Sequence, residues 1–343
     1  MTTEAATTSI RTEERASLLG RVSGSVLVRL IVRRVLIAIP LLLAISILVF
    51  AMLEAIPGDP ARNQAGMDAT EEEVEAVRKQ MGLDRPPVER YLTWLVGFVT
   101  GDLGRSSVSG QSVVSLLSER TWVTVELVVL AFVVSLALAI PVALMAARKP
   151  GGFFDRVVMV ISMTLLAVPN YVMALLLVLV FAVILRVLPA IGYVPIEDGL
   201  AANLRSVTLP VLALAVPLAC FYARFLRGDL VEQINSADYV ETARAKGVGP
   251  WKVLWRHAFR NSSFGLLTLV GLNIGGLVGG TVIIEQIFSM PGLGVLMLQG
   301  VMSRDTAVVQ ICVFIFAAVA VLANLVVDVM YAVLDPRIRY GNR

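Results

Sequence analysis

Six long apolar runs restrict the fold of this chain more than any other feature. Each is near or above the roughly 20 residues that a helix needs to cross the hydrocarbon core of a bilayer. The apolar share of 57% and the charged share of 16% differ from those of a soluble domain, which are about 45–50% and about 25%. We therefore expect an all-α integral membrane protein with six transmembrane helices, at residues 28–53, 121–147, 156–185, 205–227, 262–288 and 307–334.

The positions of basic residues indicate which ends of the spans face the cytoplasm, because cytoplasmic loops carry an excess of Lys and Arg. The first run is too long for a signal peptide and lacks a small-residue cleavage site, so it is interpreted as an uncleaved span. Basic residues precede span one and follow spans two, four and six. In a six-span chain these places share one side, so both termini, residues 1–27 and 335–343, are predicted to be cytoplasmic.

The segment between spans one and two, residues 54–120, is polar and acidic and predicts a small extracytoplasmic subdomain. Thr70 and Glu73 form a capping-box pattern that starts a short amphipathic helix. Further along, an apolar stripe at helical spacing favours a helix packed on the outer surface of the protein itself, at Tyr91, Trp94, Leu95 and Phe98.

The cytoplasmic loop 236–261 interrupts the apolar runs with five basic residues and a Gly-Val-Gly-Pro break. Ser236 is expected to cap a short helix that Gly247, Gly249 and Pro250 end. A rigid helix there suits force transmission from a partner that closes on ATP. A basic loop that binds lipid headgroups is an equally good interpretation of the composition alone.

The sequence lacks the residues that several functions would require. His257 is the single histidine, and the two cysteines, Cys220 and Cys312, lie in apolar runs where a thiol packs as a small hydrophobe. We therefore expect no metal site. No G-x-x-x-x-G-K-[ST] phosphate loop is present, so an ATPase that powers transport must be another chain. Positive-inside topology explains the basic residues, and nucleic-acid binding is not expected.

The loop and four other short motifs together resemble one family. The loop reads YVETARAKG from Tyr239, and the others are PGDP at 57–60, GDLGRS at 101–106, MPGLG at 290–294 and DPR at 335–337. The chain resembles the B-type permease subunit of the dipeptide/oligopeptide/nickel class of ABC importers, which implies the type I permease fold. The likeness covers most of the chain, and Thr242 departs from it where the family has Ala.

This resemblance implies a prokaryotic cell-membrane importer that moves di- or oligopeptides by alternating access. Its partners would be a sister C-type permease, two cytoplasmic ATPases that bind ATP and Mg, and an extracytoplasmic substrate-binding protein. The chain itself would bind no cofactor and catalyse no reaction. The resemblance also implies an ATPase-coupling segment formed by Tyr239, Glu241, Thr242, Ala243, Arg244, Ala245, Lys246 and Gly247.

Polar and small residues within the spans are the candidates for the transport pathway. Polar groups buried in a membrane are costly unless they face a cavity or a partner. On this basis the candidates for the pathway are Asn273, Asn170 and Glu126. Asp328 is expected to bond a neighbouring helix. Small residues allow close helix approach. Span five carries three overlapping G-x-x-x-G pairs, predicted to pack near the pathway or within the subunit, formed by Gly271, Gly275, Gly276, Gly279 and Gly280.

Two alternatives remain open. Nickel or nickel-chelate uptake would use the same machinery, and the sequence does not separate it from peptide uptake. A self-sufficient channel or secondary carrier would need intramembrane acidic or histidine relays and internal inverted repeats. Few candidate carboxylates and no repeat are visible, so the carrier hypothesis is the weaker one.

Overall fold

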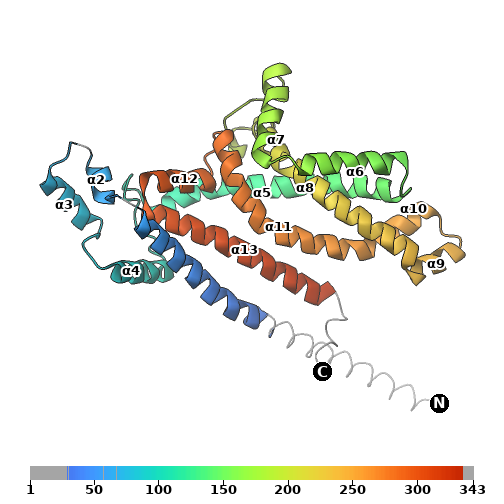
Figure 1. Cartoon of the computed structure of the whole chain (residues 1–343), viewed down its shortest axis with the longest axis horizontal. Coiled ribbons are helices and arrows are strands. Elements are labelled where there is room, and N and C mark those ends of the chain that lie inside the picture. Colours follow the sequence, from blue (N-terminus) through green and yellow to red (C-terminus); the bar gives the residue numbers. More distant parts are fainter. Residues whose placement is uncertain (1–28, 30, 57, 67, 335–343) are drawn as a thin grey trace, which may run out of the picture.

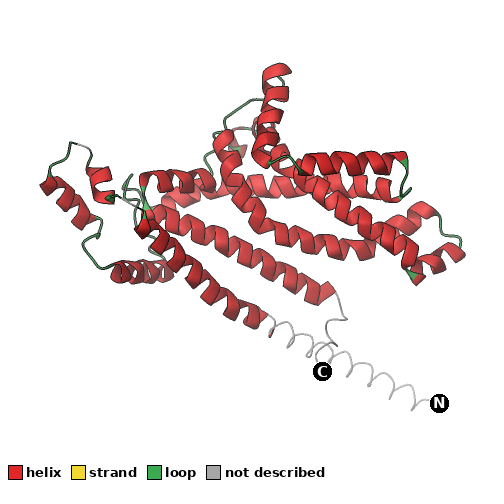
Figure 2. Ribbon diagram, in the orientation of Figure 1, coloured by secondary structure: helices red, strands yellow, loops and turns green. Residues whose placement is uncertain are grey.

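The computed structural model describes residues 29, 31–56, 58–66 and 68–334, which form helices joined by loops, with one isolated bridge and no β-strand among them (Figure 2). The tails 1–27 and 335–343, which include the DPR motif, lie outside the described residues, as does Pro57. Backbone groups have no water partner in a bilayer, and a helix pairs them internally. Five helices are long and apolar enough to span a membrane: Ile31–Ala55, α5 (Val113–Ala147), α8 (Leu200–Ser236), a continuous Pro250–Ile287 and α13 (Thr306–Leu334).

A bent helix pair lies where the third span was predicted and brings the number of spans to six when it is counted as one. Helix α6 (Phe153–Leu166) meets α7 (Asn170–Leu177), which continues as the π-helix η1 (Val178–Ile184), at 104°. The all-α membrane fold is thus confirmed, but a single uninterrupted span at 156–185 is wrong. Pro169 explains the break, because its ring removes a helix hydrogen bond and disfavours helical geometry in the preceding residue.

Several helices extend beyond the apolar runs that predicted them. Helix α5 begins at Val113, so the boundary placed at residue 120 lies inside it, and α8 extends past 205–227 at both ends. Hydropathy marks only the apolar part of a helix, whereas backbone hydrogen bonds continue into polar sequence. A short apolar helix that was not predicted, α12 (Leu293–Ser303), connects the continuous helix to α13.

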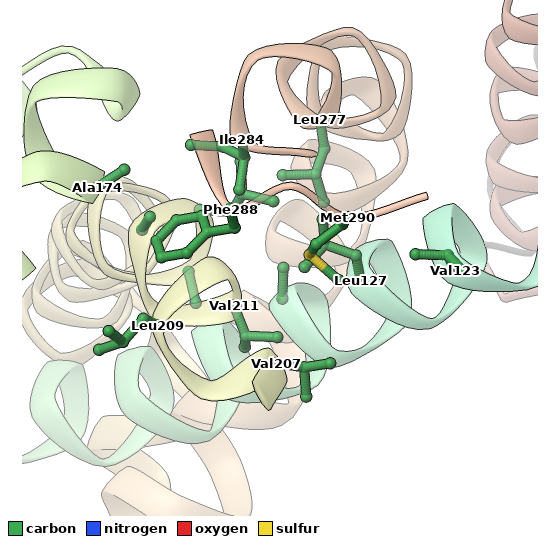
Figure 3. Packing of buried hydrophobic residues seen from close by; sticks show 14 residues of the cluster. Val123, Leu127, Ala174, Val207, Leu209, Val211, Leu277, Ile284, Phe288 and Met290 are labelled. Atoms are coloured by element: carbon green, nitrogen blue, oxygen red, sulfur yellow. The ribbon is translucent and has the colours of Figure 1, made fainter. Parts of the chain in front are cut away.

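The main core lies where α5, α7, α8 and α11 (Phe259–Ile287) meet. Leu127 of α5, Leu214 of α8 and Ile284 of α11 are at most 1% exposed. Figure 3 shows Phe288 and Met290 inserted among these helices from the turn after α11. The core therefore joins the end of α11 to α5 and α8. Between the first long helix and α13, Arg34 and Asp328 form an ion pair at 2.9 Å, which confirms that Asp328 bonds a neighbouring helix.

A three-helix subdomain lies at one end of the long axis, and the loop helices α9 (Asp238–Ala245) and α10 (Pro250–Lys252) lie at the other (Figure 1). The subdomain contains α2 (Pro60–Ala65), α3 (Glu71–Gln80) and α4 (Pro87–Thr100). The capping box is confirmed: Thr70 N donates to Glu73 Oε2 at 2.8 Å, and Glu73 N donates to Thr70 Oγ1 at 3.3 Å. The aromatic stripe packs on the protein itself, since Phe98 lies 4.5 Å from Phe314 between ring centroids.

The glycines of α11 serve two different surfaces. A β-carbon on Gly271 would overlap the Val327 side chain of α13, and one on Gly275 would lie 2.9 Å from the Ala320 β-carbon. Gly276 and Gly279 are exposed and have nothing within 4 Å of such a carbon. Gly280 lies beside Asn170 of α7. Close packing with α13 thus uses one side of α11 and leaves another side open.

We expect Gly271→Ala to destabilise the folded chain by about 1–3 kcal/mol, because the added methyl group overpacks the contact with Val327. Thermal unfolding of the purified protein in detergent measures the change. Gly276→Ala is the matched control and should be neutral or slightly stabilising. The double variant Gly271→Ala/Val327→Ala should recover much of the loss, and a failure to recover would contradict steric overlap as the cause.

Candidate functional site

Helix α9 (Asp238–Ala245) is a short amphipathic helix between the ends of α8 and the continuous helix. Its inner face carries Val240 and Ala243, which are 0% and 6% exposed and pack against Val253 of the π-helix η3 (Val253–Ala258). Its outer face exposes Glu241, Thr242 and Ala245. An apolar base on one helix and a polar outer face make α9 a projecting element fixed to the membrane bundle.

The two ends of α9 are fastened by specific bonds. At its C-terminus, Gly247 has a φ of +74°, and Val248 N donates to Ala243 O at 3.1 Å. This six-to-one bond, together with the packing of Val248 against the apolar cluster that contains Ala243, is the Schellman motif. The Tyr239 hydroxyl donates to Gln233 Oε1 of α8 at 2.7 Å. The backbone of Arg244 belongs to α9, and its side chain lies outside the described part.

The prediction that Ser236 caps this helix is wrong. Ser236 is the last residue of α8, and its hydroxyl donates to Glu232 O at 2.5 Å. Asp238 and Glu241 in the first turn of α9 instead provide the negative charge that a helix N-terminus favours. The loop is also shorter than 236–261, because helix begins again at Pro250 in α10 (Pro250–Lys252) and runs through η3 into α11.

The three pathway candidates lie on three helices and do not bond to one another within the described residues. Asn273 is half-buried and donates to Leu269 O of its own helix at 2.7 Å. Asn170 is exposed at the start of α7. Glu126 is 7% exposed, and Tyr193 donates to its Oε2 at 2.6 Å.

Tyr193 lies in the loop between η1 and α8 and fastens that loop to α5. Burial and the neighbouring Glu126 carboxylate raise the pKa of Tyr193, so the phenol stays protonated and acts as the donor. The other carboxylate oxygen of Glu126 is buried without a hydrogen-bond partner in the described part. Glu126 is therefore a buried acceptor at a helix–loop contact.

A buried carboxylate that sequence reasoning missed lies at the end of α11. Glu285 is 0% exposed and accepts from Thr124 Oγ1 of α5 at 2.6 Å and from Val295 N of α12 at 3.1 Å. Thr124 Oγ1 in turn accepts from Leu293 N at 2.8 Å. Together these two side chains satisfy the free N–H groups at the start of α12 and join it to two spans.

The glycines of the MPGLG motif are explained by this carboxylate. A β-carbon on Gly292 would overlap the Glu285 carboxylate, and one on Gly294 would lie 2.6 Å from Val282 Cα and 2.8 Å from Glu285 Oε2. Only glycine allows the chain to approach this closely. The signal available in the sequence was a carboxylate inside an apolar run, six residues before a Pro-Gly turn.

Other motifs gather at the same end of the bundle. Ser106 of the GDLGRS motif donates to Asp305, which directly precedes α13. A β-carbon on Gly58 of the PGDP motif would overlap the Arg304 side chain, and Asp59 pairs with Arg78 of α3 at 2.6 Å. Motifs that are far apart in the sequence therefore hold the subdomain, α12 and α13 together.

Comparison with known proteins agrees with this architecture. Residues 139–340 match the family described as "Binding-protein-dependent transport system inner membrane component". Residues 27–131 match the N-terminal family described as "Binding-prot-dependent transport system membrane comp, N-term". The chain belongs to this family of membrane permeases. It is a multi-pass membrane transport subunit, and the fold and the resemblance predicted from the motifs are confirmed.

The chain also resembles named relatives along most of its length. It is 40% identical over 311 residues, 91% of this chain and 99% of the relative, to a putative peptide transport system permease protein of Brucella abortus. It is 36% identical to a probable peptide ABC transporter permease of Sinorhizobium fredii, over 90% and 99% of the two chains. It is 37% identical to the glutathione transport system permease protein GsiC of Escherichia coli, over 90% and 98%.

Membership of this family makes the chain an inner membrane component of a binding-protein-dependent transport system. Permeases of this kind are transport subunits and are generally not enzymes. Among the described residues, no group of three or more His, Cys, Asp or Glu side chains could hold a metal ion.

We expect Glu285→Ala to destabilise the protein by about 3 kcal/mol, because Thr124 and the start of α12 lose a buried acceptor and each unsatisfied buried group costs about 1–3 kcal/mol. Thermal unfolding in detergent measures the loss. Gln286→Ala, which removes an exposed neighbouring side chain, is the control and should change little. Equal unfolding temperatures for the two variants would contradict the anchoring role.

Proposed function

We propose that the chain is the B-type permease of an ATP-driven importer and that α9 is the helix through which separate ATPases move it. With a sister C-type permease it forms the pathway for di- or oligopeptides. The two permeases move the peptide across the membrane by alternating access. An extracytoplasmic binding protein delivers the peptide. The observation that carries the proposal is the construction of α9: a short helix with an exposed polar face, fixed at both ends to membrane spans.

The contacts of α9 support transmission of force. A push on the outer face at Glu241 passes through Val240 and Ala243 to Val253, and from there along the continuous helix. The Schellman closure at Gly247 and the Tyr239 bond to α8 oppose tilting of α9. A displacement at a partner interface moves a span only when the intervening element keeps its shape.

The proposed orientation places α9 and both termini in the cytoplasm. Arg148, Lys149 and Arg156 surround the turn between α5 and α6, and Lys246, Lys252 and other basic residues surround α9. This distribution supports the orientation by the positive-inside rule. The three-helix subdomain at the opposite end is then extracytoplasmic, where a binding protein docks.

The proposed cargo is peptide, because relatives over nine-tenths of the chain are named for peptide or glutathione transport. A nickel or nickel-chelate importer of the same class is the second candidate. Identification of the ligand that co-purifies with the cognate binding protein separates the two. A metal complex found there would overturn the peptide assignment.

A self-sufficient carrier is the third candidate, and its requirements for transport differ from those of the importer. It transports when reconstituted alone in liposomes, whereas the proposed importer requires ATP and its ATPases. Uptake by the purified chain without ATP or partner subunits would overturn the importer proposal.

We expect Glu241→Lys to uncouple ATP hydrolysis from uptake, because it reverses the charge on the exposed face of α9 without touching its packed face. In proteoliposomes with the complete importer, peptide uptake per ATP hydrolysed should fall at least tenfold. Glu232→Lys, an exposed change at the end of α8, is the control and should retain the wild-type ratio. An unchanged ratio in the Glu241 variant would count against the coupling role.

The orientation is tested by labelling of single cysteines in a background with Cys220→Ala and Cys312→Ala. We expect Lys246→Cys to react with a membrane-impermeant maleimide in inside-out vesicles only. Asp84→Cys, which is exposed between α3 and α4, should react in right-side-out vesicles only. Labelling of both positions from one side would overturn the proposed topology.

A further inference from the structure

Helix α6 is attached to the bundle without a share in its apolar core. It lies beside α5 and α8 (Figure 1). None of the apolar clusters in the described part of the chain includes a residue of α6. Its two buried residues, Asp155 and Ser162, are both polar. The position of α6 relative to α8 therefore depends on the polar contacts that these two side chains make.

Asp155 forms a buried ion pair with Arg227 of α8, and its side chain is 4% exposed. Arg227 Nε donates to Asp155 Oδ1 at 2.8 Å, and Arg227 Nη2 donates to Oδ2, so the pair is bidentate. Gly151 N also donates to Oδ2, at 2.8 Å. One carboxylate therefore joins α6, α8 and the turn after α5, in an orientation that the planar guanidinium fixes.

The second polar contact of α6 is weaker. Ser162 lies about two helical turns after Asp155 and within hydrogen-bonding reach of the Cys220 thiol of α8. Sulfur is a weak acceptor, so the ion pair is the stronger attachment of α6. A buried ion pair contributes little net stability, because desolvation of the two charges offsets their attraction. Its bidentate geometry instead fixes the position of one helix relative to the other.

Arg227 lies in the part of α8 that leads directly to α9. Helix α8 continues without a break from Arg227 to Ser236, and Ala237 alone separates it from α9. The bond from Tyr239 to Gln233 holds α9 against the end of α8. Because a displacement of α9 also displaces the last turns of α8, it carries the Arg227 guanidinium with it.

The other end of α6 leads to the bend in the third span. Helix α6 ends at Leu166, and α7 begins after Pro169 at an angle of 104° to it. The first residue of α7, Asn170, lies beside Gly280 of α11. A shift of α6 therefore acts on the bend and on the contact between α7 and α11.

We propose that Asp155 and Arg227 are a positioning pair that transmits the displacement of α9 through α8 to α6, and from α6 to the bend at Pro169. Without the pair, α8 and α9 move and α6 does not follow them. This inference rests on the proposed coupling role of α9. It adds a second route for the movement, besides the route through Val253 and the continuous helix.

The test measures distances between spin labels by double electron–electron resonance in the complete importer, without nucleotide and with a non-hydrolysable ATP analogue. The background carries Cys220→Ser and Cys312→Ala. Thr242→Cys on α9 and Val160→Cys on α6 are each paired with Leu322→Cys on α13, and all three positions are exposed. With Asp155 and Arg227 intact, we expect both distances to shift when the nucleotide binds.

Arg227→Met should leave the shift of the α9 label intact and reduce the shift of the α6 label at least twofold. Asp155→Asn, which keeps an acceptor for Gly151 N and removes the negative charge, should have the same effect. Both variants should lower peptide uptake per ATP hydrolysed at least tenfold. Arg224→Met, which replaces a half-buried arginine three residues earlier on α8, is the matched control and should retain both shifts and the uptake ratio.

Thermal unfolding in detergent shows which of the two variants is folded, and a folded variant of either residue is sufficient for the test. An undiminished shift of the α6 label in a folded variant would overturn the role of the ion pair and leave the coupling role of α9 intact. Absence of an α9 shift with the pair intact would instead contradict the coupling role itself, and the inference with it.

Discussion

The absence of hydrogen-bonding solvent in a bilayer governs this structure, and its effect is clearest where helices stop inside the bundle. Each such place needs partners for backbone groups that a helix would otherwise pair. In the loop after η1, Gly192 N donates to Phe288 O at 2.9 Å and Val194 N donates to Ser206 Oγ at 3.2 Å. At the turn into α12, Glu285 and Thr124 supply the acceptors. The breaks are thus held by backbone and side-chain acceptors from other segments of the bundle.

The two ends of the molecule are built by different means. At the subdomain end, charged and polar side chains from separate motifs bond across long sequence distances, as Ser106 does with Asp305. At the α9 end, local contacts dominate, because Val240, Ala243 and Val253 lie within 14 residues of one another. A local structure can form as soon as its own segment is complete. The subdomain end requires the whole chain.

Sequence rules based on neighbouring residues predicted the features that contacts between neighbouring residues determine. Thr70 and Glu73 were recognisable as a capping box because both partners lie within one helical turn, and hydropathy located the spans. The direction of the bend at Pro169 depends on packing, which its sequence neighbours do not encode. Ser236 was misassigned because a serine that bonds back to the preceding turn and one that caps the next helix look alike in sequence. Glu285 was missed because its partner Thr124 is 161 residues away.

The family motifs identified the residues of the proposed site, and the structure placed them relative to one another.

The glycines of α11 have a mechanical consequence. Each glycine in a helix costs about 1 kcal/mol relative to alanine, and five lie between positions 271 and 280. Both ends of this helix are clamped, one beneath α9 and the other at Glu285. Its middle therefore has the lowest intrinsic helix propensity, and Figure 1 shows α11 curving along its length. When force is applied to such a helix, it bends near its centre before the contacts at either end break.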